Sequence, residues 1–156
     1  MSSAWSVERI HRVEASSPRA DWDRFLGILA AYWSESFPDD DMRSAEWRKT
    51  NEDRMRTRLR QYPAWLWMYE HEGRPIAVAN FYVNAGRGHI AEMYVHPSER
   101  RKGLGQFLIG AIRDVLREEG VSRLAVALPH HATDQVDFWR GAGFTEVAVE
   151  MELAIR

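Results

Sequence analysis

The chain has 156 residues, of which 45% are hydrophobic and 28% charged, and its formal net charge at pH 7 is −2. This length suits one domain with a substantial core, so we expect a single domain over residues 1–156. The small net charge argues against a broad nucleic-acid-binding surface. The absence of cysteine excludes disulfide bonds, a cysteine nucleophile and thiolate zinc sites.

The beginning of the chain, MSSAWSVERI, lacks the continuous apolar run of a signal peptide. No segment approaches the roughly 20 apolar residues that a membrane-spanning helix needs. We therefore expect a cytoplasmic protein with neither a membrane nor a nucleic acid as partner. The oligomeric state is open, with a homodimer among the alternatives.

The first sixty residues predict one strand and two helices. A loose alternation of apolar residues predicts a strand within residues 5–14. Ser17 as cap and Pro18 at the first helical position predict the start of a helix. A second helix is expected over Ser44–Arg60, after the acidic run 39–41. Its apolar edge is thin, so we expect it to be poorly anchored and mostly exposed.

The middle of the chain predicts a sheet. Strands are expected at Ala64–Tyr69, Ile76–Val83 and Ile90–Val95, and the links between them are too short for a crossover, which predicts an antiparallel meander. A helix over Leu104–Glu119 is long enough to bring the next strand, Arg123–Leu128, parallel to the third.

The C-terminal part predicts a short helix at 135–141 and then one long strand. Five apolar residues there alternate with polar or small ones, which is typical of a half-buried strand: Val147, Val149, Met151, Leu153 and Ile155. The elements together indicate an α/β fold with a mixed, mostly antiparallel sheet flanked by helices.

The turn Arg100-Arg101-Lys102-Gly103-Leu104-Gly105 carries the strongest functional signal. It precedes a helix, where unpaired N–H groups and the positive end of the dipole favour an anion. Glycines lack a Cβ atom, so they let successive N–H groups converge on a phosphate. The turn therefore predicts a phosphate site, against the alternative of a surface turn with solvated basic residues. Its glycine spacing fits neither the triphosphate loop nor the dinucleotide fingerprint.

The same turn resembles a known cofactor loop. Arg100-x-x-Gly103-x-Gly105 fits Gln/Arg-x-x-Gly-x-Gly/Ala, the acetyl-CoA pyrophosphate loop of the GCN5-related N-acetyltransferase (GNAT) superfamily. The segment MYVHPSERRKGLG also resembles that family's strand and loop, and FWRGAGF at 138–144 is similar to its later FYxxxGF motif. The resemblance covers the second half of the chain and is weak before residue 75.

The resemblance implies a GNAT-like fold whose sheet splays open between the strands Ile90–Val95 and Arg123–Leu128. Acetyl-CoA would be the co-substrate, with its pantetheine arm along the first of these strands and its pyrophosphate on the turn. The residues expected to bind it are Met93, Tyr94, Val95, Arg100, Arg101, Lys102, Gly103, Leu104, Gly105 and Trp139. No metal is expected.

The reaction that the resemblance implies is direct attack of an amine on the thioester. An alkylamine with a pKa near ~10.4 is mostly protonated at pH 7, so a base is useful. Glu92 is the candidate base, because it lies on a largely apolar strand and is expected to share a face with Ile90 and Tyr94. The alternative is a glutamate at a solvent-facing or edge position that pairs with a nearby arginine.

The group that protonates the leaving thiolate is harder to assign. Many family members supply a tyrosine, but this chain has Trp139 in that position, and Ala132 replaces an upstream asparagine common in the family. The candidate substitutes are Tyr94, His130, Tyr82 and a water. His130 and its neighbour His131 have no third ligand at a metal-binding spacing, so a polar loop near the acceptor is favoured.

The sequence thus predicts an acetyl-CoA-dependent N-acetyltransferase that acts on the primary amine of a small molecule. A protein N-terminus or a lysine side chain is the second choice of acceptor. Two alternatives stay open: a non-catalytic acyl-CoA-binding sensor, and an interaction domain whose basic turn binds a phosphorylated partner.

Overall fold

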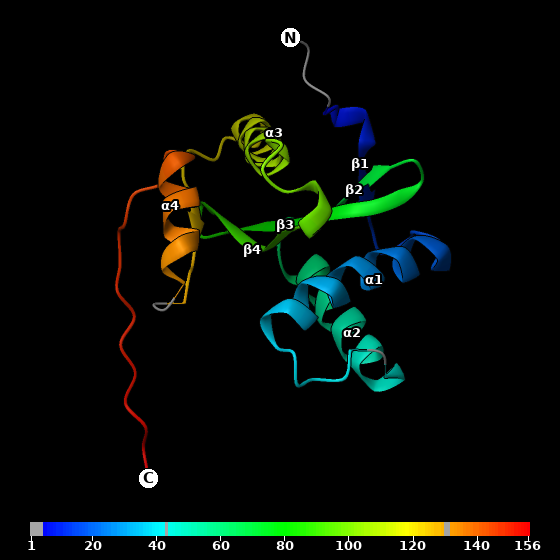
Figure 1. Ribbon diagram of the computed structural model, residues 1–156. Helices are drawn as coiled ribbons and strands as arrows, with labels where there is room; N and C mark the ends of the chain where they lie inside the picture. Colours follow the sequence, from blue (N-terminus) through cyan, green and yellow to red (C-terminus); the bar gives the residue numbers. More distant parts are fainter. Residues whose placement is uncertain (1–4, 43, 130–131) are drawn as a thin grey trace.

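A computed structural model of the chain describes residues 5–42, 44–129 and 132–156 (Figure 1). Its strands form one sheet in the order β1-β2-β3-β4-β5. Their bounds are Ile10–Val13, Ala64–His71, Arg74–Asn84, Arg87–Val95 and Leu124–Val126. Neighbouring strands are antiparallel except β4 and β5, which are parallel. The expected mixed sheet is confirmed.

Helices cover both faces of this sheet. The helices are α1 (Arg19–Ser36), α2 (Ala45–Gln61), α3 (Leu104–Glu118) and α4 (Thr133–Gly141), and short 3-10 turns span Val7–Arg9 and Pro97–Glu99. Figure 1 shows α1 and α2 on one side of the sheet and α3 on the other. Each side has its own buried apolar cluster. Within the described residues, no helix combines the length and apolar character that crossing a membrane requires.

The N-terminal boundaries differ from those expected. The first half of the predicted strand 5–14 is a 3-10 turn, because the Ser6 side chain caps it by accepting from the Glu8 N–H at 3.2 Å. The cap of α1 is Pro18 and not Ser17. The Ser17 hydroxyl instead accepts a hydrogen bond from the Glu14 N–H at 2.8 Å.

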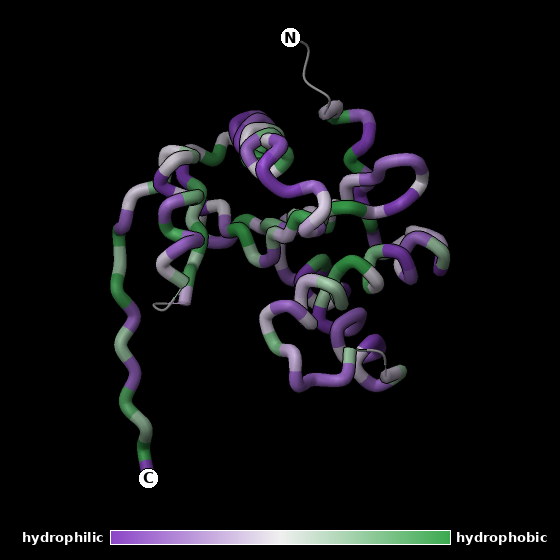
Figure 2. Tube along the Cα trace, viewed as in Figure 1, coloured by the Kyte–Doolittle hydropathy of each residue, from purple (hydrophilic) through white to green (hydrophobic). Residues whose placement is uncertain are grey.

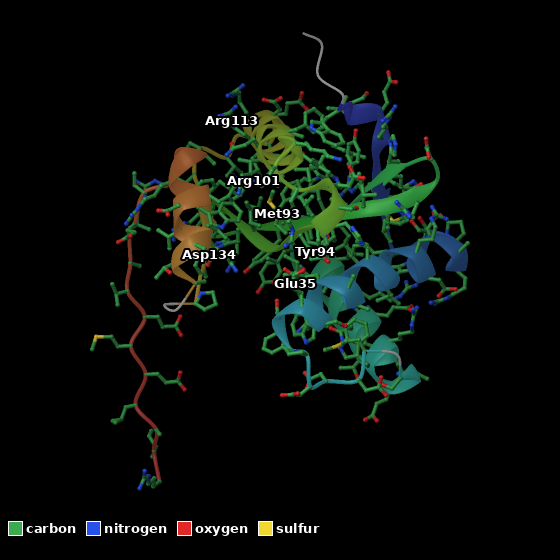
Figure 3. All side chains as sticks on the ribbon, in the orientation of Figure 1. Glu35, Met93, Tyr94, Arg101, Arg113 and Asp134 are labelled. Carbon is green, nitrogen blue, oxygen red and sulfur yellow. The ribbon has the colours of Figure 1, made fainter. Side chains whose placement is uncertain are left out.

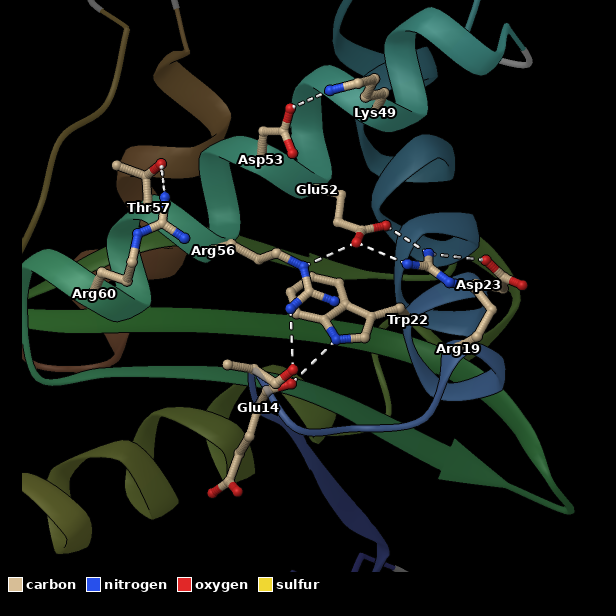
Figure 4. Close-up of polar contacts among 11 residues, drawn as sticks. Glu14, Arg19, Trp22, Asp23, Lys49, Glu52, Asp53, Arg56, Thr57 and Arg60 are labelled. Carbon is tan, nitrogen blue, oxygen red and sulfur yellow. Dashed lines mark hydrogen bonds and ion pairs between the residues drawn. The ribbon is translucent and has the colours of Figure 1, made fainter.

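Helix α2 is held more firmly than its sequence suggests. Glu52 accepts hydrogen bonds from Arg19 of α1 at 2.6 and 2.9 Å and from Arg56 at 2.9 Å (Figure 4). The bonds from Arg19, helped by the one from Arg56, lower the pKa of Glu52 to about 2. Met55 is fully buried on the same helix. The expectation of a poorly anchored helix is therefore wrong, because ion pairs add to its thin apolar edge.

Strand β4 contains a bulge that the sequence did not indicate. Asn80 pairs with Glu92, and the next residue of β3, Phe81, pairs with Ile90, which leaves Ala91 without a partner in β3. A bulge of this kind bends the strand and changes the alternation of its side chains. Ile90 therefore packs in the α3 cluster, whereas Glu92 and Tyr94 face α1 and α2. The expectation that Glu92 shares a face with Ile90 is wrong.

The C-terminal segment is not part of the sheet. Residues 145–156 are assigned to no helix or strand, and the five apolar side chains expected to be half-buried are 75% to 93% exposed. The predicted half-buried strand is therefore absent from this molecule, because the segment runs away from the sheet (Figure 1).

Candidate active site

The sheet opens at the bulge. Strand β4 pairs with β5 only from Gly88 to Ile90, which lie opposite Leu124 to Val126. Beyond Ala91, β4 continues to Val95 with β3 as its partner on the other side. The opening predicted between the parallel strands is therefore present, and residues 91–95 border it.

The backbone of the basic turn is shaped to receive an anion. Arg101 and Gly103 both have a positive φ, of 62° and 87°. Alternating left-handed and ordinary residues make a concave nest of N–H groups. Gly103 is the N-cap of α3, and no side chain caps the helix there. The N–H groups of Leu104 and Gly105 have no intrahelical acceptor at this position and point out of the helix start.

The three cations of the turn have different roles. The Arg100 guanidinium donates to the Val95 carbonyl at 2.8 Å and to both carboxylate oxygens of Glu35 in α1 at 2.8 and 2.9 Å. Lys102 pairs with Glu99 at 3.4 Å. Arg101 is the one cation of the three without an ion pair in the described part of the chain. Arg100 therefore ties the turn to α1, and Arg101 is the side chain available to an incoming anion.

Because Gly105 has no side chain, the Phe138 ring packs against it. The same absence would let a ligand approach the backbone there. A Cβ atom placed there would lie 2.9 Å from the Phe138 ring and 3.6 Å from the Met93 methyl group. Phe138 is 37% exposed, so it forms part of the surface between α3 and β4. The sequence reasoning overlooked Phe138, although it holds the first position of the FYxxxGF-like motif.

Trp139, by contrast, lies in the core. It is 7% exposed and makes edge-to-face contacts with Phe138 and Phe144, whose ring centroids are 5.2 and 5.1 Å away. The Trp139 side chain therefore belongs to the buried cluster on the α3 side of the sheet. A contact between Trp139 and the cofactor stays a prediction.

Glu92 is enclosed in a buried ion pair. Arg58 of α2 donates to its two carboxylate oxygens at 2.7 and 3.0 Å, and the Asn80 amide donates to Oε1 at 2.9 Å. Glu92 is 7% exposed. The three hydrogen bonds hold the carboxylate in one orientation between α2 and β3. The pairing with an arginine is present, but at a buried position on an inner strand and not at the solvent-facing or edge position expected for it. The geometry favours a role in fixing the bulge.

Tyr94 lies on the α1 side of β4, whereas Met93 and Arg101 lie on the α3 side (Figure 3). Its ring contacts Tyr32, with centroids 5.7 Å apart, and the Arg100 guanidinium lies 5.4 Å from its centroid. Burial raises the pKa of Tyr94, as does the charge of Glu35, while Arg100 acts against both. The phenol therefore stays protonated at neutral pH, which an acid requires.

His89 is a second titratable group on the α2 side of β4, and the sequence reasoning did not single it out. Its ring stacks on Tyr82, opposite in β3, with centroids 5.1 Å apart. Burial lowers the pKa of His89, and the nearby charge of Arg87 lowers it further. The imidazole is therefore neutral at pH 7. The bulge puts His89 and Glu92 on the same face of β4, so His89 can be recognised only once the bulge is known. The other histidine candidate, His130, lies outside the described residues.

A sheet that opens beside an anion-binding helix start is the architecture of an acyl-CoA-dependent transferase. The model of the acetyltransferase (GNAT) family matches residues 22–144. The chain therefore belongs to the GNAT family of acetyltransferases, as its motifs indicated.

The comparisons with individual proteins agree with this family. A curated relative, the mycothiol acetyltransferase of Beutenbergia cavernae, is 29% identical over 96 residues, which are 60% of this chain and 32% of that protein. The chain thus spans about a third of that relative's length.

Two solved structures share the fold. The aminoglycoside antibiotic 6'-N-acetyltransferase of Acinetobacter haemolyticus superposes with a TM-score of 0.72 and 16% identity, covering 94% of this chain and 97% of that one. The PaiA N-acetyltransferase of Thermoplasma acidophilum, in complex with coenzyme A, gives a TM-score of 0.70 and 10% identity, covering 90% and 92%. The GNAT-like fold is therefore confirmed.

Proposed function

We propose that this protein transfers the acetyl group of acetyl-CoA to the primary amine of a small molecule, by direct attack of the amine on the thioester. The observation that carries the proposal is the continuity of three features: the bulge at Ala91, the open edge of β4 and the anion-binding start of α3. A long cofactor would lie along these features, with its diphosphate at the start of α3.

The residues present suit this cofactor. The amides from Arg101 to Gly105 would hold the pyrophosphate, with the Arg101 side chain beside them. The backbone of Met93, Tyr94 and Val95, which borders the opening, would hold the pantetheine arm. When bound, the cofactor supplies the activated acetyl thioester, and the protein's task is to orient it and to manage protons.

Two groups on the α2 side of β4 are candidates for removing the amine proton. At pH 7 only about one alkylamine in ~2,500 is unprotonated, so a nearby acceptor raises the reactive fraction. His89 is neutral at pH 7, because its pKa is lowered. Glu92 already accepts three hydrogen bonds, two of them from Arg58. We assign the proton acceptor to His89 and a positioning role to Glu92, and Tyr94 is our candidate acid.

A small-molecule acceptor is supported by the relatives, since those named above include a mycothiol and an aminoglycoside acetyltransferase. The acidic residues Asp39 and Asp40 follow α1 and are exposed, which suits a cationic amine. An acetylated protein N-terminus or lysine is the competing acceptor.

The test is release of free CoA from acetyl-CoA across a panel of aminoglycosides, diamines, amino acids and short peptides. A thiol reagent reports this release cleanly, because the protein has no cysteine of its own. We expect turnover with at least one small amine and an acetylated product by mass spectrometry. Turnover with peptides alone would move the acceptor to proteins.

The second candidate function is a sensor that binds acyl-CoA without turnover. The observation that favours it is Trp139 in the place of the family's tyrosine. Tight CoA binding with no turnover for any amine supports the sensor. CoA binding no tighter than that of inorganic phosphate would remove both readings and favour an interaction domain.

A further inference from the structure

The N-terminal segment contacts the basic turn before α3. The Trp5 indole donates a hydrogen bond from Nε1 to the Lys102 carbonyl oxygen at 2.9 Å, across 97 residues of sequence. Figure 1 shows the N-terminal 3-10 turn on the same side of the sheet as α3, and Figure 2 shows the chain that leads into α3 in the purple of hydrophilic residues. Trp5 precedes the part of the chain that the family model matches, so the family motif does not include this contact.

The position of Trp5 is fixed by Tyr69 of β2. The two rings meet edge to face, with centroids 5.7 Å apart, and the neighbouring Ser6 N–H donates to the Tyr69 hydroxyl at 3.0 Å. Tyr69 is 1% exposed, and its ring also meets Phe107 in the first turn of α3, with centroids 6.2 Å apart. The indole therefore rests on a buried side chain that packs against α3, which holds its N–H group in place beside the turn.

The bond to Lys102 sets the direction of the next N–H group. In a trans peptide, the C=O and the following N–H lie in one plane and point to opposite sides. The described part of the chain contains no cis peptide bond. A Lys102 carbonyl that is turned toward Trp5 therefore leaves the Gly103 N–H pointing away from the indole. This N–H is one of those that form the nest at the start of α3.

Gly103 makes an external contact of this kind useful. Its φ is 87°, and a glycine has few steric limits on rotation of the peptide that precedes it. The peptide that follows it is held by the helix, because the Gly103 carbonyl accepts from the Phe107 N–H at 3.0 Å. Arg100 anchors the beginning of the turn through the Val95 carbonyl at 2.8 Å. Trp5 acts between these two anchors, on the peptide that joins Lys102 to Gly103.

We propose that Trp5 is a positioning residue for the cofactor: its indole N–H holds the Lys102–Gly103 peptide in the orientation that aims the Gly103 N–H at the diphosphate. The inference rests on the proposed function, because it takes the anion at the turn to be the diphosphate of CoA. Without the hydrogen bond, the peptide can turn over and present a carbonyl oxygen to the phosphates in place of an N–H group. The negative end of that dipole repels an anion.

The affinity for CoA, measured by calorimetry on the full chain, tests this role. Trp5→Phe removes the N–H donor and keeps an aromatic ring to pack on Tyr69. We expect the affinity to fall about 3- to 10-fold, the range for the loss of one hydrogen bond. The control Trp47→Phe makes the same change at a partly buried tryptophan of α2, on the other side of the sheet, and should leave the affinity unchanged. An unchanged affinity in Trp5→Phe would overturn the proposal.

A double-mutant cycle with Gly103→Ala shows whether Trp5 acts through this peptide. A Cβ atom at Gly103 is strained by the φ of 87°, but it would lie 3.8 Å from the Trp5 Nε1, an ordinary contact that leaves the indole in place. Because both changes disturb the same peptide, adding Trp5→Phe to Gly103→Ala should lower the affinity by less than about 2-fold. The full loss in both backgrounds would overturn the proposal, since Trp5 would then act elsewhere.

The same measurements separate a failure of this inference from a failure of the proposed function. If Gly103→Ala weakens CoA binding and Trp5→Phe does not, the turn binds the cofactor without help from Trp5. If the wild-type chain and Gly103→Ala bind CoA equally well, the turn is not the diphosphate site, and the positioning role of Trp5 is overturned with it.

Discussion

The two halves of strand β4 differ in how they are held. From Gly88 to Ile90 the strand has partners on both sides, and the Gly88 N–H donates to the Arg123 carbonyl at 2.9 Å. From Glu92 to Val95 it has β3 on one side and the opening on the other, and the Arg58–Glu92 ion pair holds it. The candidate site therefore lies where strand pairing stops, and buried polar contacts keep the unpaired half of β4 in place.

The largest expected effect comes from breaking the ion pair of the open half. Arg58→Ala leaves the Glu92 carboxylate buried without its partner, and such losses typically cost about 3 to 5 kcal/mol. Chemical denaturation measures the change in the free energy of unfolding. The double variant Arg58→Met/Glu92→Gln removes both charges and should recover much of the loss. A single variant that loses under about 1 kcal/mol would show that the pair does not hold the bulge.

The second prediction concerns proton transfer by His89, which belongs to the paired half of β4. His89→Gln should lower kcat by about 100-fold, the range expected for losing a general base. In the wild type, kcat should fall as the pH drops below the ordinary histidine pKa of 6.5, because the pKa of His89 is lowered and the imidazole becomes charged only there.

The pH profiles of two variants separate the roles of His89 and Glu92. His89→Gln should remove the fall in kcat at acidic pH. Glu92→Gln should lower kcat by a factor that is the same at every pH, so the shape of its pH profile should match that of the wild type. If Glu92→Gln is the variant that removes the acidic fall, Glu92 is the base and His89 is not.

The third prediction targets the nest at the end of the open half. Gly103→Val forces a branched side chain into a φ of 87°, which costs about 1 to 3 kcal/mol of strain or displaces the N–H groups. The affinity for CoA, measured by calorimetry, should fall by at least about 10-fold. The control Gly110→Ala, in the interior of the same helix, meets only the end of the Arg113 side chain at 3.9 Å and should leave CoA affinity unchanged. Equal affinities in the two variants would remove the turn from the cofactor site.

Much of this architecture was readable from the sequence, because its signals are local. Apolar alternation and short turns predicted the meander of β2, β3 and β4, and the length of α3 predicted the parallel β5. The basic glycine turn was predicted for the same reason: its glycines and the helix after it are adjacent in the chain. The N-terminal strand was overestimated, since a Ser6 cap competes with strand pairing.

The parts that were not predicted depend on contacts between distant residues. Arg58 and Glu92 are 34 residues apart. Helix α2, which carries Arg58, has few apolar residues, so its sequence pattern does not indicate which face packs on the sheet. The bulge has no glycine at Ala91 to signal it, so only the pairing with β3 reveals that His89 and Glu92 share a face. The alternation near the C-terminus predicted a half-buried strand that residues 145–156 do not form, because a pattern within one segment does not specify a sheet edge for it to pair with.

The smallest expected effect lies in the paired half of β4, and it tests whether the two halves are independent. A Cβ atom at Gly88 would lie 2.6 Å from the Leu116 side chain and 3.3 Å from the Arg123 carbonyl oxygen, so Gly88→Ala forces that tightly packed contact apart. We expect a loss of about 1 kcal/mol in the free energy of unfolding, since the flexible end of Leu116 can move. CoA affinity should stay at the wild-type value, because the opening begins only beyond Ile90. A variant that binds CoA as weakly as Gly103→Val would mean that the position of β5 sets the width of the opening, and the closed and open halves would then act as one unit.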